Sequence, residues 1–258
     1  MRNIMRHLFI CVAFMASAMS YCIAANNDVT ELKDTVQYQD TTVIVTETDS
    51  LKLYKPIFYG GIDLCCGRGD NPPMGLNHVF VAAAAYTKSY NWTKFNHNLI
   101  AGPHIDSEYH EGYYCEANSG AFYYVDSSRR WDFVYHGYRE TLRDLDGKGS
   151  GFSQVMLVFN GSVCKIHKEA KPKSKRLRRA ICDIDNELYI IDSKHPMTMP
   201  DFAKILINAG AFHALYMDMG SMRFSAYKEH FEADWTEIHP RNPKSLYATN
   251  YLVFYYVD

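Results

Sequence analysis

The sequence lacks the patterns that mark several common classes of protein. Its 27 Lys and Arg residues nearly balance its 29 Asp and Glu residues, so no overall basic charge points to nucleic acid, and we expect none among its partners. Its seven cysteines include no CxxC pair, which leaves zinc-ribbon and thioredoxin motifs unsupported. Internal repeats and linker-like segments are also missing. The chain is therefore expected to form one main domain.

The one marked apolar run lies at the N-terminus and has the form of a secretory signal peptide. Arg2 and Arg6 precede the apolar residues 8–18, and Cys22-Ile23-Ala24 fits a small-residue cleavage site. The run is short for a membrane span, which takes about 20 residues. We expect residues 1–24 to be a cleaved signal peptide, with an uncleaved anchor as the alternative. No transmembrane segment is expected after cleavage, and the protein is expected to be secreted or held in the periplasm or cell envelope.

Cleavage would leave a polar leader, a folded domain and five cysteines. Residues 25–55 are polar and rich in Thr and Asp, and residues 41–46 within them read as a strand or as extended chain. Residues 56–258 are expected to form the domain. Because five is an odd number, at least one cysteine is unpaired in a monomer, and the sequence does not select a disulfide.

Aromatic and β-branched runs bounded by turn residues predict more strands than helices. Two hairpins are indicated, one turning at Asn160-Gly161 and the other at Asp185-Asn186. Further strands are predicted over residues 79–86, 112–125 with a turn at 118–120, 214–217 and 251–257.

One helix is clearly marked. Thr198 is expected to cap its N-terminus, with Asp201 three residues later as in a variant capping box. Apolar residues follow at i, i+3, i+4 and i+7, and Gly210 ends the helix. The hairpin before it and the strand after it complete the pattern. The expected class is α+β, with a largely antiparallel twisted sheet and helices packed on one face.

Four potential metal ligands crowd residues 104–110. His104, Asp106, Glu108 and His110 alternate along the chain, and imidazole and carboxylate groups both bind zinc. However, no zinc signature has this spacing. The pattern favours a solvated polar loop, and the sequence predicts no metal and no other cofactor.

Residues 165–179 are rich in Lys and Arg, with Glu169 as the only acid. Such a segment attracts phosphate, anionic glycans or nucleic acid, although the lack of interleaved aromatic residues disfavours nucleic acid. A solvated loop is the simplest expectation. At its end, charge enters a strand that heads for the core, at Arg178-Arg179-Ala180-Ile181.

Several motifs, taken in order, resemble the phosphodiester glycosidase family. The resemblance covers residues 79–258. The motifs are Asn118-Ser119-Gly120-Ala121-Phe122 after a strand, Arg178-Arg179-Ala180-Ile181 at the entry to a hairpin, a helix over residues 197–211, Met217-Asp218 at a strand end, and Asn250-Tyr251-Leu252-Val253 near the C-terminus. The family's glycine-rich run after the aspartate is replaced here by Met219-Gly220-Ser221-Met222.

The resemblance implies an enzyme that hydrolyses a sugar-1-phosphodiester, with a glycan or sugar-phosphate as substrate. Asp218 would act as nucleophile, base or electrostatic stabiliser, and Asn118 would hydrogen-bond a sugar hydroxyl or a phosphate oxygen. Arg178 would clamp the phosphate bidentately, or Arg179 would if the register differs by one residue. The other residues that the resemblance implies in substrate binding are Gly120, Gly220 and Ser221.

Two other functions stay open. An inactive relative would bind a glycan or the cell envelope without turnover, because Met219 and Met222 stand where glycines would let the backbone approach a ligand. A structural surface protein would instead scatter Asn118, Arg178 and Asp218. A non-functional explanation of these residues is that Asn118 caps a turn and that Arg178 pairs with Asp218 as a buried ion pair.

Overall fold

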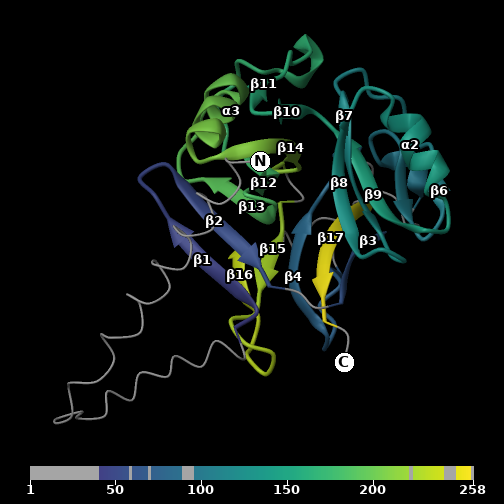
Figure 1. Cartoon of the computed structure of the whole chain (residues 1–258), viewed down its shortest axis with the longest axis vertical. Coiled ribbons are helices and arrows are strands. Elements are labelled where there is room, and N and C mark those ends of the chain that lie inside the picture. The colour runs from purple at the N-terminus through teal and green to yellow at the C-terminus, as the bar shows by residue number, and fades with distance from the viewer. Residues whose placement is uncertain are drawn as a thin grey trace, which may run out of the picture. The chain divides into compact units, whose positions relative to one another are not determined.

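The structure, a computed structural model shown in Figure 1, describes six stretches of the chain. These stretches are residues 41–57, 60–68, 71–88, 96–220, 223–240 and 248–256. The predicted signal peptide lies outside them, and so do Ser221 and Met222. Within the described stretches, no helix has the length and apolar character needed to cross a membrane.

The largest sheet has seven strands, and each strand runs antiparallel to its neighbours. Its central strand, β12, is buried along its whole length. In order across the sheet, the strands are β1 (Val43–Glu47), β2 (Leu51–Pro56), β13 (Glu187–Ser193), β12 (Arg179–Ile184), β14 (Ala211–Met217), β10 (Met156–Phe159) and β11 (Ser162–Val163).

Two five-stranded antiparallel sheets complete the strand framework. One contains, in order, β16 (Thr236–His239), β15 (Ser225–Tyr227), β4 (His78–Ala83), β17 (Ala248–Tyr255) and β3 (Gly61–Arg68). The other contains β6 (Tyr109–His110), β5 (His104–Asp106), β9 (Gly149–Gln154), β7 (Gly120–Val125) and β8 (Arg130–Tyr135).

All three sheets contribute side chains to one hydrophobic core. Ile181 comes from the seven-stranded sheet, Phe80 from the sheet that contains β4, and Phe122 from the sheet that contains β7. Phe80 packs edge-on against Phe254 of the neighbouring strand. The other face of the seven-stranded sheet has a separate core, which it shares with a helix.

Both predicted hairpins are present, and their turns explain why. Asn160 and Gly161 join β10 to β11 with φ angles of 50° and 68°. Asp185 and Asn186 join β12 to β13 with φ angles of 54° and 61°. Positive φ at both central residues matches the right-handed twist of the strands, and Asn, Asp and Gly tolerate it best.

The predicted helix is α3 (Met199–Asn208), and it covers one face of the seven-stranded sheet (Figure 1). The Thr198 hydroxyl accepts a hydrogen bond from the Asp201 backbone N–H at 3.2 Å, which satisfies one of the free donors of the first turn. Phe202 and Leu206 are fully buried on the helix face that meets the sheet. Gly210 follows the helix with a φ of 96°.

The second described α-helix corrects the predicted class. It is α2 (Tyr138–Asp144), and its buried Leu142 packs with Ile105 and Ala121 of a different sheet from the one that α3 covers. The largely antiparallel sheet structure is confirmed, but the helices do not share one face, and the protein is richer in β-structure than expected. A helix of two turns is too short to show a helical period in sequence. The short 3-10 helices η2 (His97–Leu99) and η3 (Lys168–Ala170) complete the described helices.

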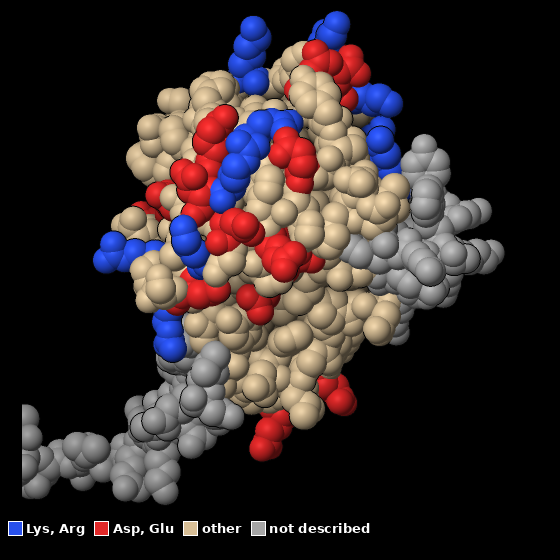
Figure 2. Space-filling model, turned by 90° about the vertical axis from the view of Figure 1, so that its right-hand side faces the viewer, with Lys and Arg blue, Asp and Glu red and all other residues tan. Residues whose placement is uncertain are grey.

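The molecular face in Figure 2 shows acidic and basic side chains interspersed rather than gathered by sign. On α2 itself, Arg139 and Arg143 both form ion pairs with Glu111. Exposed pairs of this kind contribute little to stability.

Two loop predictions also need correction. The strand predicted as one alternative for residues 41–46 is confirmed as β1. The leader also contains β2, in which Leu51 and Tyr54 are each only 1% exposed, so the folded unit begins well before residue 56. The predicted polar loop at 104–110 contains β5 and β6, and His104 is fully buried. Sequence could not show this, because the strands that cover His104 come from distant parts of the chain.

A buried ion pair connects the centre of the seven-stranded sheet to its neighbour. Arg179 on β12 donates two hydrogen bonds to the Asp192 carboxylate on β13, at 2.7 and 2.8 Å. Arg179 also donates to the Ser225 hydroxyl on β15 at 2.7 Å. Burial favours protonation of Asp192, but the Arg179 charge and hydrogen bonds outweigh it, and the pKa of Asp192 lies below its usual value.

We expect Arg179→Met to lower the free energy of unfolding by about 3–5 kcal/mol, because it removes the guanidinium from the buried Asp192 carboxylate and leaves the His239 imidazole, 3.1 Å away, beside it. Denaturant unfolding at neutral pH measures this loss. Removing both charges, in Arg179→Met with Asp192→Leu, should recover much of it. The exposed Arg130→Met is the matched control and should change stability by less than about 0.5 kcal/mol. A loss below about 1 kcal/mol for Arg179→Met would show that the pair does not constrain the fold.

Candidate active site

The register of the seven-stranded sheet brings Arg178 and Asp218 together. Arg179, the first residue of β12, pairs with Met217, the last residue of β14. Arg178 and Asp218 are therefore opposite each other at the same end of two antiparallel strands. Opposite residues on neighbouring strands project from the same face. Here that is the face covered by α3, where Tyr216 of β14 also packs.

Arg178 and Asp218 line one cavity of about 370 Å³. Three other segments complete its wall: the chain that follows β4, the chain that precedes β7, and the basic segment that precedes β12. The lining residues are Tyr86, Thr87, Lys88, Tyr113, Cys115, Ala117, Glu169, Ala170, Lys171, Ser174, Arg176, Arg178, Asp218 and Gly220.

Arg178 is a buried cation held by neutral groups. It is 1% exposed. Its Nε donates to the Met197 carbonyl at 3.1 Å, and its two terminal nitrogens donate to the Tyr216 hydroxyl and to Ser174. In the described part of the chain, no carboxylate lies within ion-pair distance of it, so the possible Arg178–Asp218 pair is not formed. A buried charge without a counter-ion is costly, and an anion in the cavity would relieve that cost.

Asp218 is held as a buried carboxyl at the cavity wall. Its backbone N–H donates to the Ala84 carbonyl at 2.7 Å, and its Oδ1 accepts a hydrogen bond from the Gly220 N–H at 2.8 Å. Burial raises the pKa of Asp218 to about 6, although the Gly220 hydrogen bond and the Arg179 charge oppose the rise. A carboxyl that titrates near neutrality is suited to proton transfer.

The cavity carries more positive than negative charge. Lys88, Lys171 and Arg176 line it together with Arg178, whereas its acids are Asp218 and Glu169. Since clefts lined by one sign of charge concentrate counter-ions, the cavity is suited to an anionic ligand such as a phosphate ester.

Tyrosines form the less polar part of the wall. Burial raises the pKa values of Tyr86 and Tyr113, that of Tyr113 to about 12, so both phenols stay protonated at neutral pH and can donate hydrogen bonds. Lys88 Nζ lies 4.2 Å from the centroid of the Tyr113 ring. A phenol ring presents an apolar face and a polar edge, the combination that a sugar ring also has.

Arg179, the second predicted phosphate ligand, lies on the opposite face of the sheet from the cavity. Consecutive residues of an extended strand project to opposite faces, and Arg179 is committed to Asp192 and Ser225. The geometry therefore distinguishes the two arginines, with Arg178 at the cavity and Arg179 in the core.

Asn118 and Gly120 are not among the lining residues, although Ala117 beside them is. The Asn118 Nδ2 donates to the Ala101 carbonyl at 3.0 Å and to Ser153, while its Oδ1 is buried without a hydrogen-bond partner among the described residues. A side chain at Gly120 would meet Met156 and the Val134 carbonyl. Close strand packing thus explains Gly120.

The turn after Asp218 is described only in part. Gly220 lines the cavity, whereas Met219 is buried and is not among the lining residues. A β-carbon at Gly220 would lie 3.1 Å from the Asp218 Oδ1, so this one glycine suits the close approach of the backbone to the carboxylate. Ser221 and Met222 lie outside the described residues.

Sequence reasoning missed most of the cavity wall. Lys171, Ser174 and Arg176 belong to the basic segment that was expected to be a solvated loop. Its charge was the available signal, but sequence alone did not show that the segment folds over the end of β12. Tyr86, Lys88 and Tyr113 carried no motif.

The fold and site together define a protein of antiparallel sheets with a cationic cavity beside a buried carboxyl. No protein-family model matches the sequence, and no curated protein does either. The fold is similar to that of the catalytic domain of zebrafish N-acetylglucosamine-1-phosphodiester alpha-N-acetylglucosaminidase, in a structure auto-inhibited by its pro-peptide. The TM-score is 0.52 at 11% identity, covering 83% of this chain and 81% of that chain. A hypothetical protein from Synechocystis has a TM-score of 0.43 at 11% identity, covering 82% and 61%.

This similarity shows a distant relationship of fold to a phosphodiester glycosidase. At 11% identity it does not extend to the substrate.

We expect Asp218→Asn to leave the protein at least as stable as the wild type at pH 7.5. The folded protein binds the Asp218 proton more tightly than the unfolded chain does, so ionisation costs stability as pH rises from about 4 to about 6. Asparagine keeps the acceptor for the Gly220 N–H and removes this cost, which is on the order of 1–3 kcal/mol. Melting temperatures at pH 4.5 and 7.5 test this. A variant that loses several degrees at pH 7.5 would show that the charged carboxylate is stabilising.

Proposed function

We propose that this protein is a hydrolase that cleaves a sugar-1-phosphodiester in the cavity beside Asp218. The proposal is carried by one observation: Arg178, a buried cation with no carboxylate partner among the described residues, lines the same cavity as a buried carboxyl whose pKa is near 6. The similarity of fold to the zebrafish catalytic domain supports it.

The phosphate would bind at the cationic side of the cavity. Arg178 is oriented by Met197, Tyr216 and Ser174 before any ligand arrives, so little side-chain entropy is lost on binding. Lys171 and Arg176 would add charge from the covering segment. The sugar ring would then lie against Tyr86 and Tyr113.

The reaction breaks the bond between the anomeric carbon and the phosphate oxygen. The electron pair leaves with the phosphomonoester, which is a good leaving group without added acid. The ionised Asp218 would either attack the anomeric carbon or accept a proton from the attacking water, and in both routes a water oxygen ends on the sugar. Cations around the phosphate would stabilise the charge that develops there.

An inactive relative that binds a glycan is the second candidate. It is favoured by the departure at Met219-Gly220, where the resemblance leads us to expect consecutive glycines. Such a protein would bind a sugar-1-phosphate without turning over a diester, so binding and turnover must be measured separately.

The test is hydrolysis of N-acetylglucosamine-1-phosphodiesters and of other sugar-1-phosphodiesters, followed by the release of reducing sugar and phosphomonoester. We expect kcat/KM to rise with pH through about 6, as Asp218 ionises. Asp218→Asn should abolish turnover, and Arg178→Met should lower kcat/KM by at least about 100-fold, the loss of a hydrogen bond to a charged group. Turnover that survives in Asp218→Asn would exclude this site.

A matched pair of lysines tests the covering segment. Lys171 lines the cavity, whereas Lys173 is exposed two residues away and does not. Lys171→Met should raise KM about 10-fold, because it removes a positive charge from the wall of the cavity. Lys173→Met should keep KM within about twofold of the wild-type value, because Lys173 does not line the cavity. Binding of sugar-1-phosphates without any turnover would favour the inactive relative.

We also propose that the protein is exported, as its N-terminal pattern indicates. N-terminal sequencing of the protein recovered from its producing cells should find Ala25 as the first residue. A chain that starts at residue 1 and stays in the membrane fraction would show an uncleaved anchor instead.

A further inference from the structure

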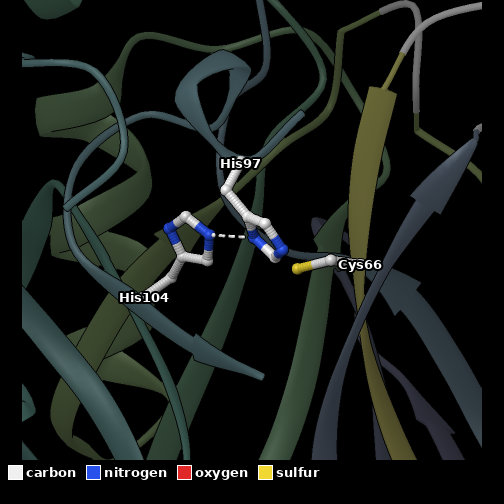
Figure 3. A group of neighbouring side chains, drawn as sticks. All are labelled: Cys66, His97 and His104. Carbon is white, nitrogen blue, oxygen red and sulfur yellow. Dashed lines mark hydrogen bonds between the residues drawn. The ribbon is translucent and has the colours of Figure 1, made fainter. Parts of the chain in front are cut away.

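A cluster of imidazole, thiol and carboxylate groups lies where β3 meets β5 and η2. Cys66 comes from β3, His97 from η2 and His104 from β5, and the three side chains turn toward one another with His97 in the middle (Figure 3). The His97 Nδ1 lies 3.0 Å from the His104 Nε2. One ligand atom from each of the three lies within 4.8 Å of the other two.

His104 is prepared as a metal ligand by its surroundings. It is fully buried, and its Nδ1 lies 3.0 Å from the Gly102 carbonyl oxygen. Because a carbonyl can only accept, Nδ1 carries the proton, and the Nε2 lone pair faces His97. A ligating histidine in metalloproteins is fixed in this way by a carbonyl or carboxylate at its other nitrogen.

Asp106 supplies the outer carboxylate that such sites use. Its Oδ1 accepts a hydrogen bond from the His110 Nε2 at 2.9 Å, and its Oδ2 lies 3.7 Å from the His97 Nε2. Without a metal, the Nδ1 proton of His97 bridges to His104. When a metal takes that position, the proton can reside on His97 Nε2, facing Asp106.

We propose that Cys66, His97 and His104 bind a zinc ion. Tetrahedral zinc with Zn–N bonds of about 2.0–2.1 Å separates its nitrogen ligands by about 3.3 Å, so the 3.0 Å gap between His97 and His104 needs only a small opening. A thiolate with two imidazoles selects zinc over magnesium or calcium. Binding releases the Cys66 proton, and a water completes the tetrahedron.

A second set of ligands, His97, Asp106 and His110, shares one histidine with the first. His97 and His110 stack with their centroids 3.4 Å apart. We assign the zinc to the first set because His104 is fully buried with its lone pair aligned, and because Cys66 adds a soft ligand.

The site would join two sheets. Cys66 belongs to the sheet of β4 and β17, and His104 to the sheet of β7 and β9. The chain between His97 and His104 also reaches the wall of the cavity, because Ile100 forms a bridge with Thr87. Zinc is thus expected to stabilise the fold whether or not the proposed hydrolysis is correct.

The experiment uses the full chain without a polyhistidine tag, stripped with a chelator and titrated with zinc chloride. We expect one zinc per chain, and a melting temperature that rises by about 5–10 °C at a hundredfold excess over Kd. Cys66→Ser and His104→Gln should each reduce the affinity at least about 100-fold, and Asp106→Asn about 10–100-fold. The controls Cys164→Ser and the exposed His195→Gln should bind as the wild type does.

Cobalt(II) serves as a spectroscopic probe of the ligands in the wild-type protein. The wild-type complex should show a thiolate-to-cobalt charge-transfer band in the near ultraviolet, together with the visible bands of a tetrahedral ion. The proposal is overturned if no saturable binding of one ion occurs or if the thiolate band is missing. It is also overturned if His110→Gln abolishes binding while His104→Gln does not, since that result assigns the ion to the other set.

Discussion

The buried ion pair between Arg179 and Asp192 constrains the rest of the structure. Two arginines stand side by side at the start of β12, and a shift of one residue in register would exchange their faces. Arg179 is held in the core by a bidentate bond to Asp192 and by Ser225 of the neighbouring sheet. In some proteins such pairs specify the structure rather than add net stability. Here, the specified register sends Arg178 to the cavity and places it opposite Asp218.

The properties of the cavity follow from the burial of Arg178 and Asp218 in a wall that carries more basic than acidic side chains. Arg178 is surrounded by carbonyls and hydroxyls, which orient the guanidinium but leave its charge for a ligand to neutralise. Burial raises the pKa of Asp218 to about 6, and this effect outweighs the opposing Gly220 hydrogen bond and Arg179 charge. These opposite conditions, in one cavity, suit an anionic substrate and a reaction that moves a proton. The fold around this cavity is similar to that of a phosphodiester glycosidase catalytic domain.

Local patterns in the chain predicted local structure well. The turns at Asn160-Gly161 and Asp185-Asn186, and the cap at Thr198, are short-range effects of φ preference and hydrogen bonding, and each is present as expected. Local sequence patterns failed for elements whose packing partners lie far away in the chain. β2 looked like part of a polar leader because its buried Tyr54 packs against strands far along the chain, and α2 was too short to show a period.

The sequence by itself determined the hairpins, the main helix, the antiparallel character of the sheets and three residues of the cavity, Arg178, Asp218 and Gly220. Only the tertiary structure decided which arginine faces the cavity, since this depends on the pairing of β12 with β14. It also decided that the basic segment covers that cavity, and that Cys66 and His97 join His104. Contacts between residues far apart in the chain come from the packing of whole sheets, which no local spacing records.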